Sequence, residues 1–443
     1  MHYNKKILGL LLMASTSMAI STANATDAEV LNELKALKER ITYLEQKLEK
    51  TQISEKKSSP SKAVSSPQDL ILKLSPAPSI STADKSTSFA VDGRILADAG
   101  FVSGDGSSAD FANATDFRAV RAGVKGKIMT DWMYRFIIDF ANNSTSIKDV
   151  FLSYTGLKTF SIAAGHFKEF NGIEALSSSL HTTFMERSSA VTTFRTGRNL
   201  GISGKYYSDN LGIQLGIFGE SPDDNGSDDE GYGFSGRIFG QAINTENELL
   251  HLGASIRYRT PDSASDSVRF RSRGESHVIG ERLVDTGTIN GVDNHISYAA
   301  ELRYQNGPAS IMGEYYITDV SREAESDLTF NSGYIALSYF LTGDQRSYKK
   351  SSGKYGGVSP KSPFSLSEGG KGAWEIAGRY TFLDLNDGTV NGGELDAWTL
   401  GVNWYPNKNV KFMLNYVINE LDDNAIYPDE DPHYIMLRSQ VSF

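Results

Sequence analysis

The segment HYIMLRSQVSF, residues 433–443, alternates apolar and polar side chains and stops on a phenylalanine. One parity carries Ile435, Leu437, Val441 and Phe443, and the other carries Tyr434, Arg438, Gln440 and Ser442. Successive side chains of a β-strand point to opposite faces, so this segment has an apolar face and a polar face. Such strands suit a barrel with lipid outside and water inside. About sixteen similar segments between Ser88 and Phe443 predict an all-β transmembrane fold, an antiparallel barrel of about sixteen strands.

The composition is compatible with a water-filled barrel and excludes several other classes. Hydrophobic residues make up 39% of the 443 residues and the mean hydropathy is -0.33, too polar for a helical membrane protein. A barrel is expected to be this polar because alternate strand residues face water. The absence of cysteine excludes disulfides and cysteine–metal sites. The net charge of -10 argues against nucleic acid as a partner.

Residues 1–25 have the features of a secretory signal peptide. Lys5 and Lys6 give the positive start, residues 7–14 form the apolar core, and residues 23–25 (Ala-Asn-Ala) form the cleavage site. The apolar core is too short to span a bilayer as a retained helix. Together with a barrel, the signal predicts export to the outer membrane of a Gram-negative cell.

A heptad repeat and a linker precede the barrel. In residues 26–51, the two core positions of the heptad are filled by Val30, Leu37 and Leu44 and by Leu34, Ile41 and Leu48. This spacing predicts a short coiled coil; the alternative is an amphipathic helix packed on its own chain. Residues 52–87 are rich in Ser and Pro and are predicted to form a linker. The expected domains are therefore 1–25, 26–51, 52–87 and the barrel, 88–443.

The connections between the expected strands differ in length. Short polar turns are expected at 129–131, 209–210 and 406–408, and long connections at 102–115, 220–231, 261–294, 344–371 and 421–431. Outer-membrane barrels have short periplasmic turns and long external loops. The long connections are therefore expected on the outside of the cell.

Several motifs along the barrel region resemble one known family. They include FRAVRAGVKG at 117–126, GHFKEF at 165–170, TTFMERS at 182–188, YFLTGDQRSYK at 339–349 and TLGVNWYPNKNVKFMLNY at 399–416. In order and number they resemble the phosphate-selective porins O and P. The resemblance implies a homotrimer of sixteen-stranded barrels, each with its own pore, surrounded by lipid and lipopolysaccharide. It implies passive diffusion of anions, phosphate or phosphorylated solutes, and a role for Phe443 as a barrel-assembly signal.

Three arginines with strand spacing form the sharpest local feature. Arg269, Arg271 and Arg273 would share one face of a strand. Guanidinium groups stay charged and bind phosphate oxygens in a bidentate way. The segment matches the family's arginine ladder, which leads anions to the constriction, and His277 stands where a further ladder arginine is common. The alternative is a solvated edge of the 261–294 loop that contacts lipopolysaccharide phosphates.

A second group of residues is expected at the centre of the pore. By parity Arg94 points inward, and by resemblance Arg94, Asp149 and Arg187 belong to the central anion site. Arg121 and Lys125 face inward from one strand and add positive charge. A carboxylate among arginines can accept a hydrogen bond from a protonated phosphate and weakens binding enough to permit release. The alternative is that each charge is bonded to a neighbour across the barrel.

The sequence departs from the family at three of these positions. Two adjacent arginines are common in the second strand, but here Arg118 is followed by Ala119, and by parity only Ala119 faces inward. Two loop lysines are replaced by Ala175 and Leu180. Each charged hydrogen bond to an anion is worth about 1.5–3 kcal/mol. Anion preference is therefore expected to survive through the ladder, while phosphate selectivity is not.

Other classes of function have weaker support. No nucleophile motif, zinc motif or phosphate-binding glycine loop is present, so neither an enzyme nor a metal or other cofactor is expected. The acidic stretch 223–230 lacks the ligand spacing of a calcium loop and is expected to be a solvated external loop. Two alternatives to an anion pore remain: a weakly selective porin for other solutes, and an envelope-tethering trimer with an incidental pore.

Overall fold

The computed structural model describes residues 32, 35–47, 69–75, 77–103, 111–195, 197–221, 229–422, 427 and 430–443. The chain divides into two compact units, Met1–Ser66 and Pro67–Phe443. In the first unit residues 35–47 are helical, within the segment for which a helix was expected. Of the described helices, none has the length and apolarity needed to cross a bilayer.

The helix exposes its apolar positions. Leu37, Ile41 and Leu44 are 46%, 53% and 51% exposed. These residues belong to the heptad, while Val30, Leu34 and Leu48 lie outside the described residues. The helix is thus confirmed, and its pairing into a coiled coil stays a prediction.

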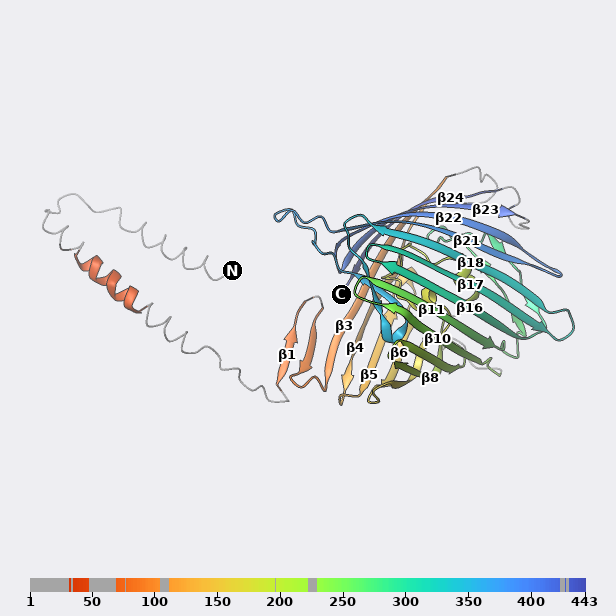
Figure 1. Ribbon diagram of the computed structural model, residues 1–443, viewed down its shortest axis with the longest axis horizontal. Helices are drawn as coiled ribbons and strands as arrows, with labels where there is room; N and C mark the ends of the chain where they lie inside the picture. The colour runs from red at the N-terminus through yellow and green to blue at the C-terminus, as the bar shows by residue number, and fades with distance from the viewer. Residues whose placement is uncertain are drawn as a thin grey trace. The chain divides into compact units, whose positions relative to one another are not determined.

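The second unit is built on an antiparallel sheet of eighteen strands, sixteen of which close into a barrel (Figure 1). Each barrel strand pairs with the next along the chain, and β24 pairs with β3 to close the ring. The fold expected from the alternating segments is therefore confirmed. The strands are β3 (Ser88–Ser103), β4 (Ala114–Ile128), β5 (Trp132–Asp139), β6 (Ser146–Tyr154), β7 (Phe160–Lys168), β8 (Arg198–Ser208), β9 (Leu211–Phe218), β10 (Gly233–Asn244), β11 (Glu248–Arg259), β16 (Val292–Asn306), β17 (Ala309–Arg322), β18 (Leu328–Phe340), β21 (Ala373–Asp387), β22 (Val390–Asn407), β23 (Val410–Asp422) and β24 (His433–Ser442).

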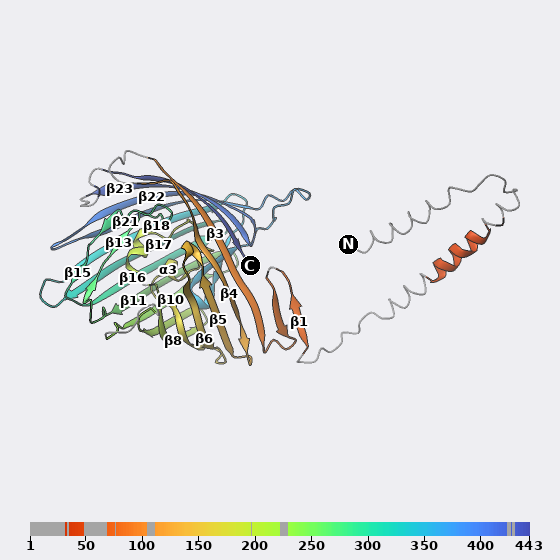
Figure 2. The same cartoon turned by 180° about the vertical axis from the view of Figure 1, so that it is seen from behind.

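A hairpin extends the sheet at the closing seam. The pairing of β24 with β3 runs from His433 opposite Ser103 to Ser442 opposite Arg94. Beyond the end of β24, β2 (Ser79–Thr82) pairs with the start of β3, and β1 (Leu70–Lys73) pairs with β2. The end of the chain lies beside β3 in both ribbon views (Figure 2).

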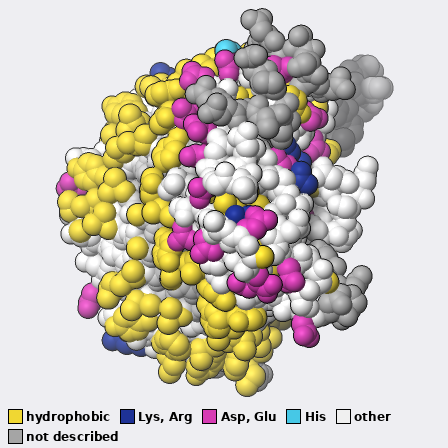
Figure 3. Space-filling model, turned by 90° about the vertical axis from the view of Figure 1, so that its right-hand side faces the viewer, with side chains coloured by type: hydrophobic (Ala, Val, Ile, Leu, Met, Phe, Trp, Pro, Cys, Tyr) yellow, Lys and Arg dark blue, Asp and Glu magenta, His cyan; other side chains and the backbone are white. Residues whose placement is uncertain are grey.

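The barrel wall follows the parity read from the sequence. In β24, Tyr434, Met436, Arg438 and Gln440 are buried, and Ile435, Leu437 and Val441 are exposed. Apolar side chains on the outside of the wall meet lipid, and the alternate side chains meet the lumen. Figure 3 looks onto the loop-bearing end, where apolar side chains cover the outer wall and charged side chains gather over the loops.

One connection lies at the opposite end from the one expected. The connection between β18 and β21 holds β19 (Arg346–Lys349), the 3-10 turn η2 (Lys350–Ser352) and β20 (Lys354–Val358). The Phe364 N–H donates to the carbonyl of Pro406 (2.7 Å), at the end of β22 and next to the short turn that leads to β23. The expectation that 344–371 is an external loop is wrong. Each strand crosses the barrel wall, so successive connections lie at alternate ends of the barrel. The number of preceding strands therefore decides the end at which a connection lies, and the length of the connection does not.

Two connections fill one side of the lumen. The first of the two, between β7 and β8, holds α3 (Ile173–Leu176) and α4 (Ser189–Phe194). The short connection between β5 and β6, which is not one of the two, holds the 3-10 turn η1 (Ala141–Asn143). The connection between β11 and β16 holds β12 (Ser267–Val268), β13 (Arg271–Ser272), β14 (Val284–Asp285) and β15 (Ile289–Asn290). Their apolar residues, including Phe184, Phe194, Phe270 and Leu283, pack in one cluster with inward residues of β16–β24. The packing leaves open space beside β3–β8.

Candidate functional site: the lumen passage

A cavity of about 950 Å³ lies between the wall formed by β3–β8 and the connection that follows β7. We call residues 169–197 of that connection the constriction loop. Among the described residues that line the cavity, twelve are basic and one, Asp92, is acidic. The basic residues are Arg94, Arg118, Arg121, Lys125, Lys127, Arg135, Lys148, Lys168, Arg187, Arg195, Arg198 and Lys349. A confined, low-dielectric passage with one sign of charge concentrates ions of the other sign, so this cavity favours anions.

The constriction loop is held in the lumen through its backbone. Side chains of the barrel wall and of the connection after β18 donate hydrogen bonds to its carbonyl oxygens. The bonds join Gln440 to Leu180 O (3.1 Å), Arg346 to His181 O, Lys411 to Thr182 O (2.7 Å), Asn403 to Thr183 O (2.8 Å), Arg438 to Met185 O and Arg379 to Glu186 O (3.2 Å). The loop therefore folds inward, as the family resemblance implies.

Arg94 stands in β3 and points into the cavity, as its parity predicts. Its guanidinium donates to the hydroxyls of Ser178 and Ser179 in the constriction loop, both at 3.3 Å. It forms no ion pair with a carboxylate of the described residues, although only 7% of the residue is exposed. The guanidinium and the two hydroxyls can therefore bind an anion together.

Three of the other expected pore residues, Asp149, Arg121 and Lys125, form ion pairs. Asp149 accepts a bidentate bond from Arg198 in β8 (2.9 and 3.2 Å). Arg121 pairs with Asp139 (2.8 Å), and Lys125 lies 3.3 Å from Asp92. Carboxylates that already have a cation partner repel a passing anion less, because their charge is largely offset.

Arg187 is placed in the cavity wall by the constriction loop itself. Its guanidinium donates to the carbonyls of Glu174 and Ser177, each at 2.8 Å. Burial lowers the pKa of Arg187, and nearby Glu174 opposes that shift. Because its bonds go to neutral carbonyls, its charge remains available to the cavity.

The expectation that Arg118 faces away from the lumen is wrong. On β3, Leu96 pairs with Ala119 and Ala97 pairs with Phe117, so Arg118 is an extra residue in a β-bulge. A bulge turns two successive side chains to one side of the sheet. Arg118 thus lines the cavity beside Ala119. Its guanidinium donates to both carboxylate oxygens of Glu186 in the constriction loop (2.8 and 3.0 Å), and this ion pair offsets its charge.

Comparison with known proteins decides the family. A family model described as "Phosphate-selective porin O and P" matches residues 89–443. The chain belongs to the phosphate-selective porin O and P family.

Two relatives and one solved structure agree with this. An uncharacterized protein of Caulobacter vibrioides is 30% identical over 370 residues, 81% of this chain and 73% of the relative. Porin O of Pseudomonas aeruginosa is 27% identical over 396 residues, 80% of this chain and 88% of the relative. The barrel of OmpT of Vibrio cholerae, in a trimer form, matches 81% of this porin and 100% of that chain with a TM-score of 0.51 and 12% identity. This porin is therefore an outer-membrane barrel, and family and fold point to a channel and not to an enzyme.

The three ladder arginines of the porin share one face. Arg269, Arg271 and Arg273 are at least partly exposed, while Phe270 and Ser272 between them are buried. Arg269 forms a bidentate pair with Asp285 (2.7 and 2.6 Å), and Arg273 donates to the carbonyl of Gly280 (2.9 Å). The pKa of Arg273 is lowered by burial and then by the charges of Arg271 and Arg118, so it lies within electrostatic reach of the cavity. Their role as a ladder stays a prediction.

His277 adds no charge to this row at neutral pH. Burial, with the nearby Arg118, lowers the pKa of His277 to about 4. The imidazole is therefore neutral at pH 7, unlike the arginine that is common here in the family.

The three departures from the family lie around the cavity. Ala119 is 1% exposed and borders an enclosed space of about 10 Å³, next to Arg118 and Ser179. Leu180 lines the cavity. At Ala175 the backbone carbonyl accepts from Lys168 Nζ (2.5 Å), which brings a strand lysine to the position of a missing loop lysine.

Sequence reasoning missed several lining residues, among them Lys148, Lys168, Arg195, Arg198 and Lys349. Parity would not have identified Lys168, because it shares the parity of Phe160 and Ile162, which are exposed on the outer wall, and Gly165 with a φ of 134° interrupts the regular strand before it. Arg195 and Lys349 belong to irregular connections, where parity carries no information. The acidic stretch 223–230 lies mostly outside the described residues.

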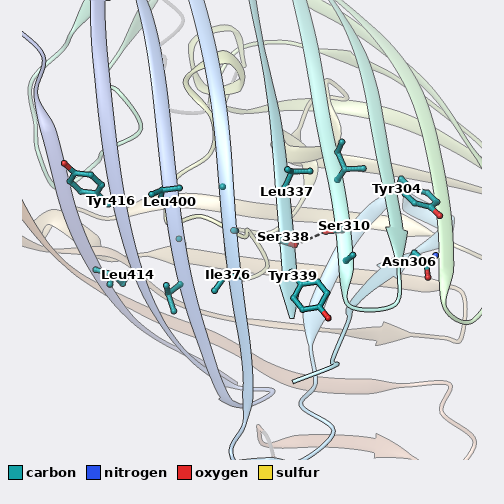
Figure 4. A pocket seen from close by; sticks show the side chains of 16 residues that line it. Tyr304, Asn306, Ser310, Leu337, Ser338, Tyr339, Ile376, Leu400, Leu414 and Tyr416 are labelled. Carbon is teal, nitrogen blue, oxygen red and sulfur yellow. Dashed lines mark hydrogen bonds between the residues drawn. The ribbon is translucent and has the colours of Figure 1, made fainter. Parts of the chain in front are cut away.

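A second hollow lies on the outer wall and is apolar (Figure 4). Exposed side chains of Leu337, Ile376, Leu400 and Leu414 line it, together with Ser310 and Ser338, whose hydroxyls are joined by a hydrogen bond (2.9 Å). Outward apolar side chains of this kind face lipid. This hollow therefore carries no part of an ion pathway.

Proposed function

We propose that this porin passes anions by passive diffusion, with phosphate or phosphorylated solutes as its substrates. The observation that carries the proposal is the excess of basic residues around the cavity, twelve against one aspartate. Arg94, Lys148 and Arg195 line the cavity without an ion pair to a described carboxylate. An anion that loses part of its hydration in the passage is compensated by these groups.

The pathway begins at the arginine ladder. Arg269, Arg271 and Arg273 attract the anion at the outer mouth, and Arg273 lies within electrostatic reach of Arg118 at the cavity. Arg94, Ser178 and Ser179 then replace part of its hydration shell. Weak, successive sites let an ion enter and leave, which fast diffusion requires.

The exit is also basic. Lys125, Lys127 and Lys349 line the cavity toward the end where the short turns lie. Asp92, which accepts from Arg135 (2.7 Å), keeps this stretch from binding an anion too tightly. The aspartates thus assist release.

The selectivity for phosphate is the finer part of the proposal. It is supported by membership in the family and by the likeness to Porin O. Ala119, Ala175 and Leu180 remove basic side chains, and Lys168 and Arg187 supply charge nearby. We expect phosphate to bind, more weakly than in a pore that has every lysine and arginine of the family pattern.

The remaining parts of the chain are assigned by the same reasoning. We propose a signal peptide at 1–25, a coiled coil at 26–51, a linker at 52–87 and a homotrimer of barrels in lipid and lipopolysaccharide. The trimer form of OmpT supports the homotrimer. The exposed heptad residues Leu37, Ile41 and Leu44 support a helix that pairs between copies.

The test is a planar-bilayer recording of the purified porin under a salt gradient, with inorganic phosphate added to chloride. The expected results are an anion-selective reversal potential and block of the chloride current by phosphate. Arg94→Gln should weaken the block, while Lys158→Gln, in an exposed turn, should not. Cation preference in the unmodified porin contradicts the whole proposal, and anion preference without block contradicts phosphate selectivity.

A further inference from the structure

The connection between β18 and β21 ends in a small hairpin at the rim of the barrel. We call residues 361–371 the rim hairpin. Its two arms are joined where the Ser365 N–H donates to the carbonyl of Gly370 (3.1 Å). The Phe364 N–H donates to the carbonyl of Pro406 (2.7 Å) at the end of β22. The rim hairpin is therefore held to the wall beside the short turn between β22 and β23.

The rim hairpin packs on the outer face of the wall. Trp404 of β22 has the outward parity and stacks between Trp374 of β21 and Phe412 of β23, with ring centroids 5.6 and 5.5 Å apart. The ring of Phe364 meets Trp404 edge to face at 5.2 Å, and Trp404 Nε1 donates to the carbonyl of Lys371 (3.0 Å). Outward aromatic rings on neighbouring strands mark the interface between lipid and water. The rim hairpin therefore contacts the lipid side of the wall, at that interface.

The same connection contacts the lumen side at its other end. Arg346 donates to Glu375 (2.8 Å) and to the hydroxyl of Tyr405 (3.0 Å), and both partners are buried on the inward parity. Trp404 and Tyr405 are consecutive in β22, so they point to opposite faces of the wall. The contacts of Phe364 thus lie outside the barrel, and the rim hairpin is no part of the anion passage.

The tip of the rim hairpin exposes apolar side chains. Leu366 is 92% exposed, the largest fraction among the large apolar side chains of the described residues, and Phe364 remains 44% exposed although it packs on Trp404. Because a chain advances at most about 3.6 Å per residue, Leu366 lies within about 7 Å of Phe364. The headgroup layer between hydrocarbon and water is about 5–8 Å thick on each side of a bilayer. Leu366 is therefore within reach of this layer.

The charges around the rim hairpin suit anionic headgroups. Lys361, Lys371 and, in the adjacent short turn, Lys408 are exposed, and none of them forms an ion pair with a carboxylate of the described residues. Lys361 Nζ donates to the carbonyl of Gly343 (2.5 Å), which leaves its charge in place. Glu368 is the one acidic residue in the sequence of the rim hairpin. Lysines beside a membrane surface are attracted to anionic lipids.

We propose that the rim hairpin is a membrane-surface anchor that binds anionic phospholipid in the periplasmic leaflet. Phe364 and Leu366 enter the headgroup layer, where they lose contact with water, and Lys371 and Lys408 lie against the lipid phosphates. The partner is lipid because the contact continues the aromatic row of the outer wall, which already faces lipid. This inference rests on the place of the barrel in a membrane and does not depend on the solute.

The first experiment uses the absence of cysteine from the chain. Leu366→Cys and the control Lys158→Cys, in an exposed turn at the same end of the barrel, carry the same fluorescent label in vesicles of phosphatidylethanolamine and phosphatidylglycerol. A lipid with a nitroxide near its headgroup quenches a label in that layer, and iodide quenches a label in water. We expect the label at residue 366 to be quenched by the lipid nitroxide and shielded from iodide, and the label at residue 158 to be quenched mainly by iodide.

Two results of this experiment overturn the inference. If the label at residue 366 behaves like the label at residue 158, the tip stands in water. If it is shielded from both quenchers, the tip lies against another copy of the chain. Neither result concerns conductance, so the proposed anion pore would still stand.

The second experiment tests the headgroup. Nitroxide-labelled phosphatidylglycerol and phosphatidylcholine are compared as quenchers of the label at residue 366, and the anionic lipid should be preferred by about fivefold for each lysine that contacts it. Lys371→Gln combined with Lys408→Gln should bring the two lipids close to equal quenching, while Lys158→Gln should leave the preference in place. Equal quenching by the two lipids without these lysine changes overturns the binding of anionic phospholipid.

Discussion

Phe443 and Gly93 exchange both of their backbone hydrogen bonds, with N–O distances of 2.9 and 3.0 Å. The ring of Phe443 lies over Gly93 so closely that a side-chain carbon there would come within 2.3 Å of the ring. The last residue of the chain therefore completes the closing seam between β24 and β3. A residue without a side chain is required opposite it.

Gly93→Ala is expected to weaken barrel closure. The added methyl group displaces the ring of Phe443, and overpacking of this kind costs about 1–3 kcal/mol. The fraction of folded barrel that resists unheated detergent electrophoresis should fall. Gly240→Ala is the matched control, because the nearest atom lies at 3.6 Å there. Equal folded fractions for the two variants would show that the ring moves aside at no cost.

Glu314→Gln is expected to loosen the constriction loop. The Glu314 carboxylate accepts from the N–H groups of Ile173 (2.7 Å) and Glu174 (3.0 Å) and from the hydroxyls of Tyr316 and Tyr334. An amide presents donors where these groups need acceptors, so the start of α3 should detach. We expect a larger unit conductance and a weaker anion preference in bilayer recordings.

Glu248→Gln serves as the control for that change. Glu248 accepts from Tyr304 near a short turn (2.7 Å), away from the loop. If Glu314→Gln lowers only thermal stability and leaves conductance and selectivity at the level of Glu248→Gln, Glu314 does not position the loop.

Leu180→Lys is expected to strengthen phosphate binding. Leu180 lines the cavity, and a charged hydrogen bond to an anion is worth about 1.5–3 kcal/mol. Half-block of chloride current should need about ten- to hundredfold less phosphate. Leu157→Lys, in an exposed turn, adds the same charge outside the cavity. An unchanged titration for Leu180→Lys would place the anion away from residue 180.

Lys354 is expected to make the conductance depend on pH. Burial, with Lys205 and Arg237 nearby, lowers the pKa of Lys354 to about 7. The ammonium is charged below that pH and neutral above it, so positive charge is lost as the pH rises from 6 to 8. Anion conductance at low ionic strength, where screening is weakest, should fall over this interval. Lys354→Met should remove the dependence, and a variant that retains it would assign the effect to another group.

Deletion of residues 27–51 is expected to leave conductance intact and to lower the thermal stability of the oligomer. The exposed Leu37, Ile41 and Leu44 gain burial when copies of the helix pair. The melting of the trimer by electrophoresis against temperature measures this. An unchanged trimer together with weaker attachment of the envelope layers would favour the tethering function instead.

Regular strands were predictable from the sequence, and irregular backbone was not. Period-two alternation predicted the wall because lipid and water select opposite faces, and it placed Arg94 correctly. It failed at Arg118 because a bulge shifts parity by one residue. Connection length, a separate criterion, misplaced 344–371, because the number of preceding strands sets the end of the barrel at which a connection lies.

The pore itself was predictable only in part. The spacing of Arg269, Arg271 and Arg273 predicted their shared face, but not the pairing of Arg269 with Asp285. Arg195 carried no signal, since its position depends on the path of a loop. The sequence shows which lumen residues are lysine or arginine. Whether each forms an ion pair with a carboxylate depends on contacts between residues far apart in the sequence.

The constriction loop is anchored through its backbone, so its position depends little on which side chains it carries. Lys411, Asn403 and Gln440 bind oxygens that every residue type possesses, so substitutions at the anchored positions keep these bonds available. Leu180, Thr182 and Thr183 can therefore change without loss of these bonds. A barrel of this design can acquire new solutes by exchange of a few loop residues, and can be engineered in the same way while the wall stays constant.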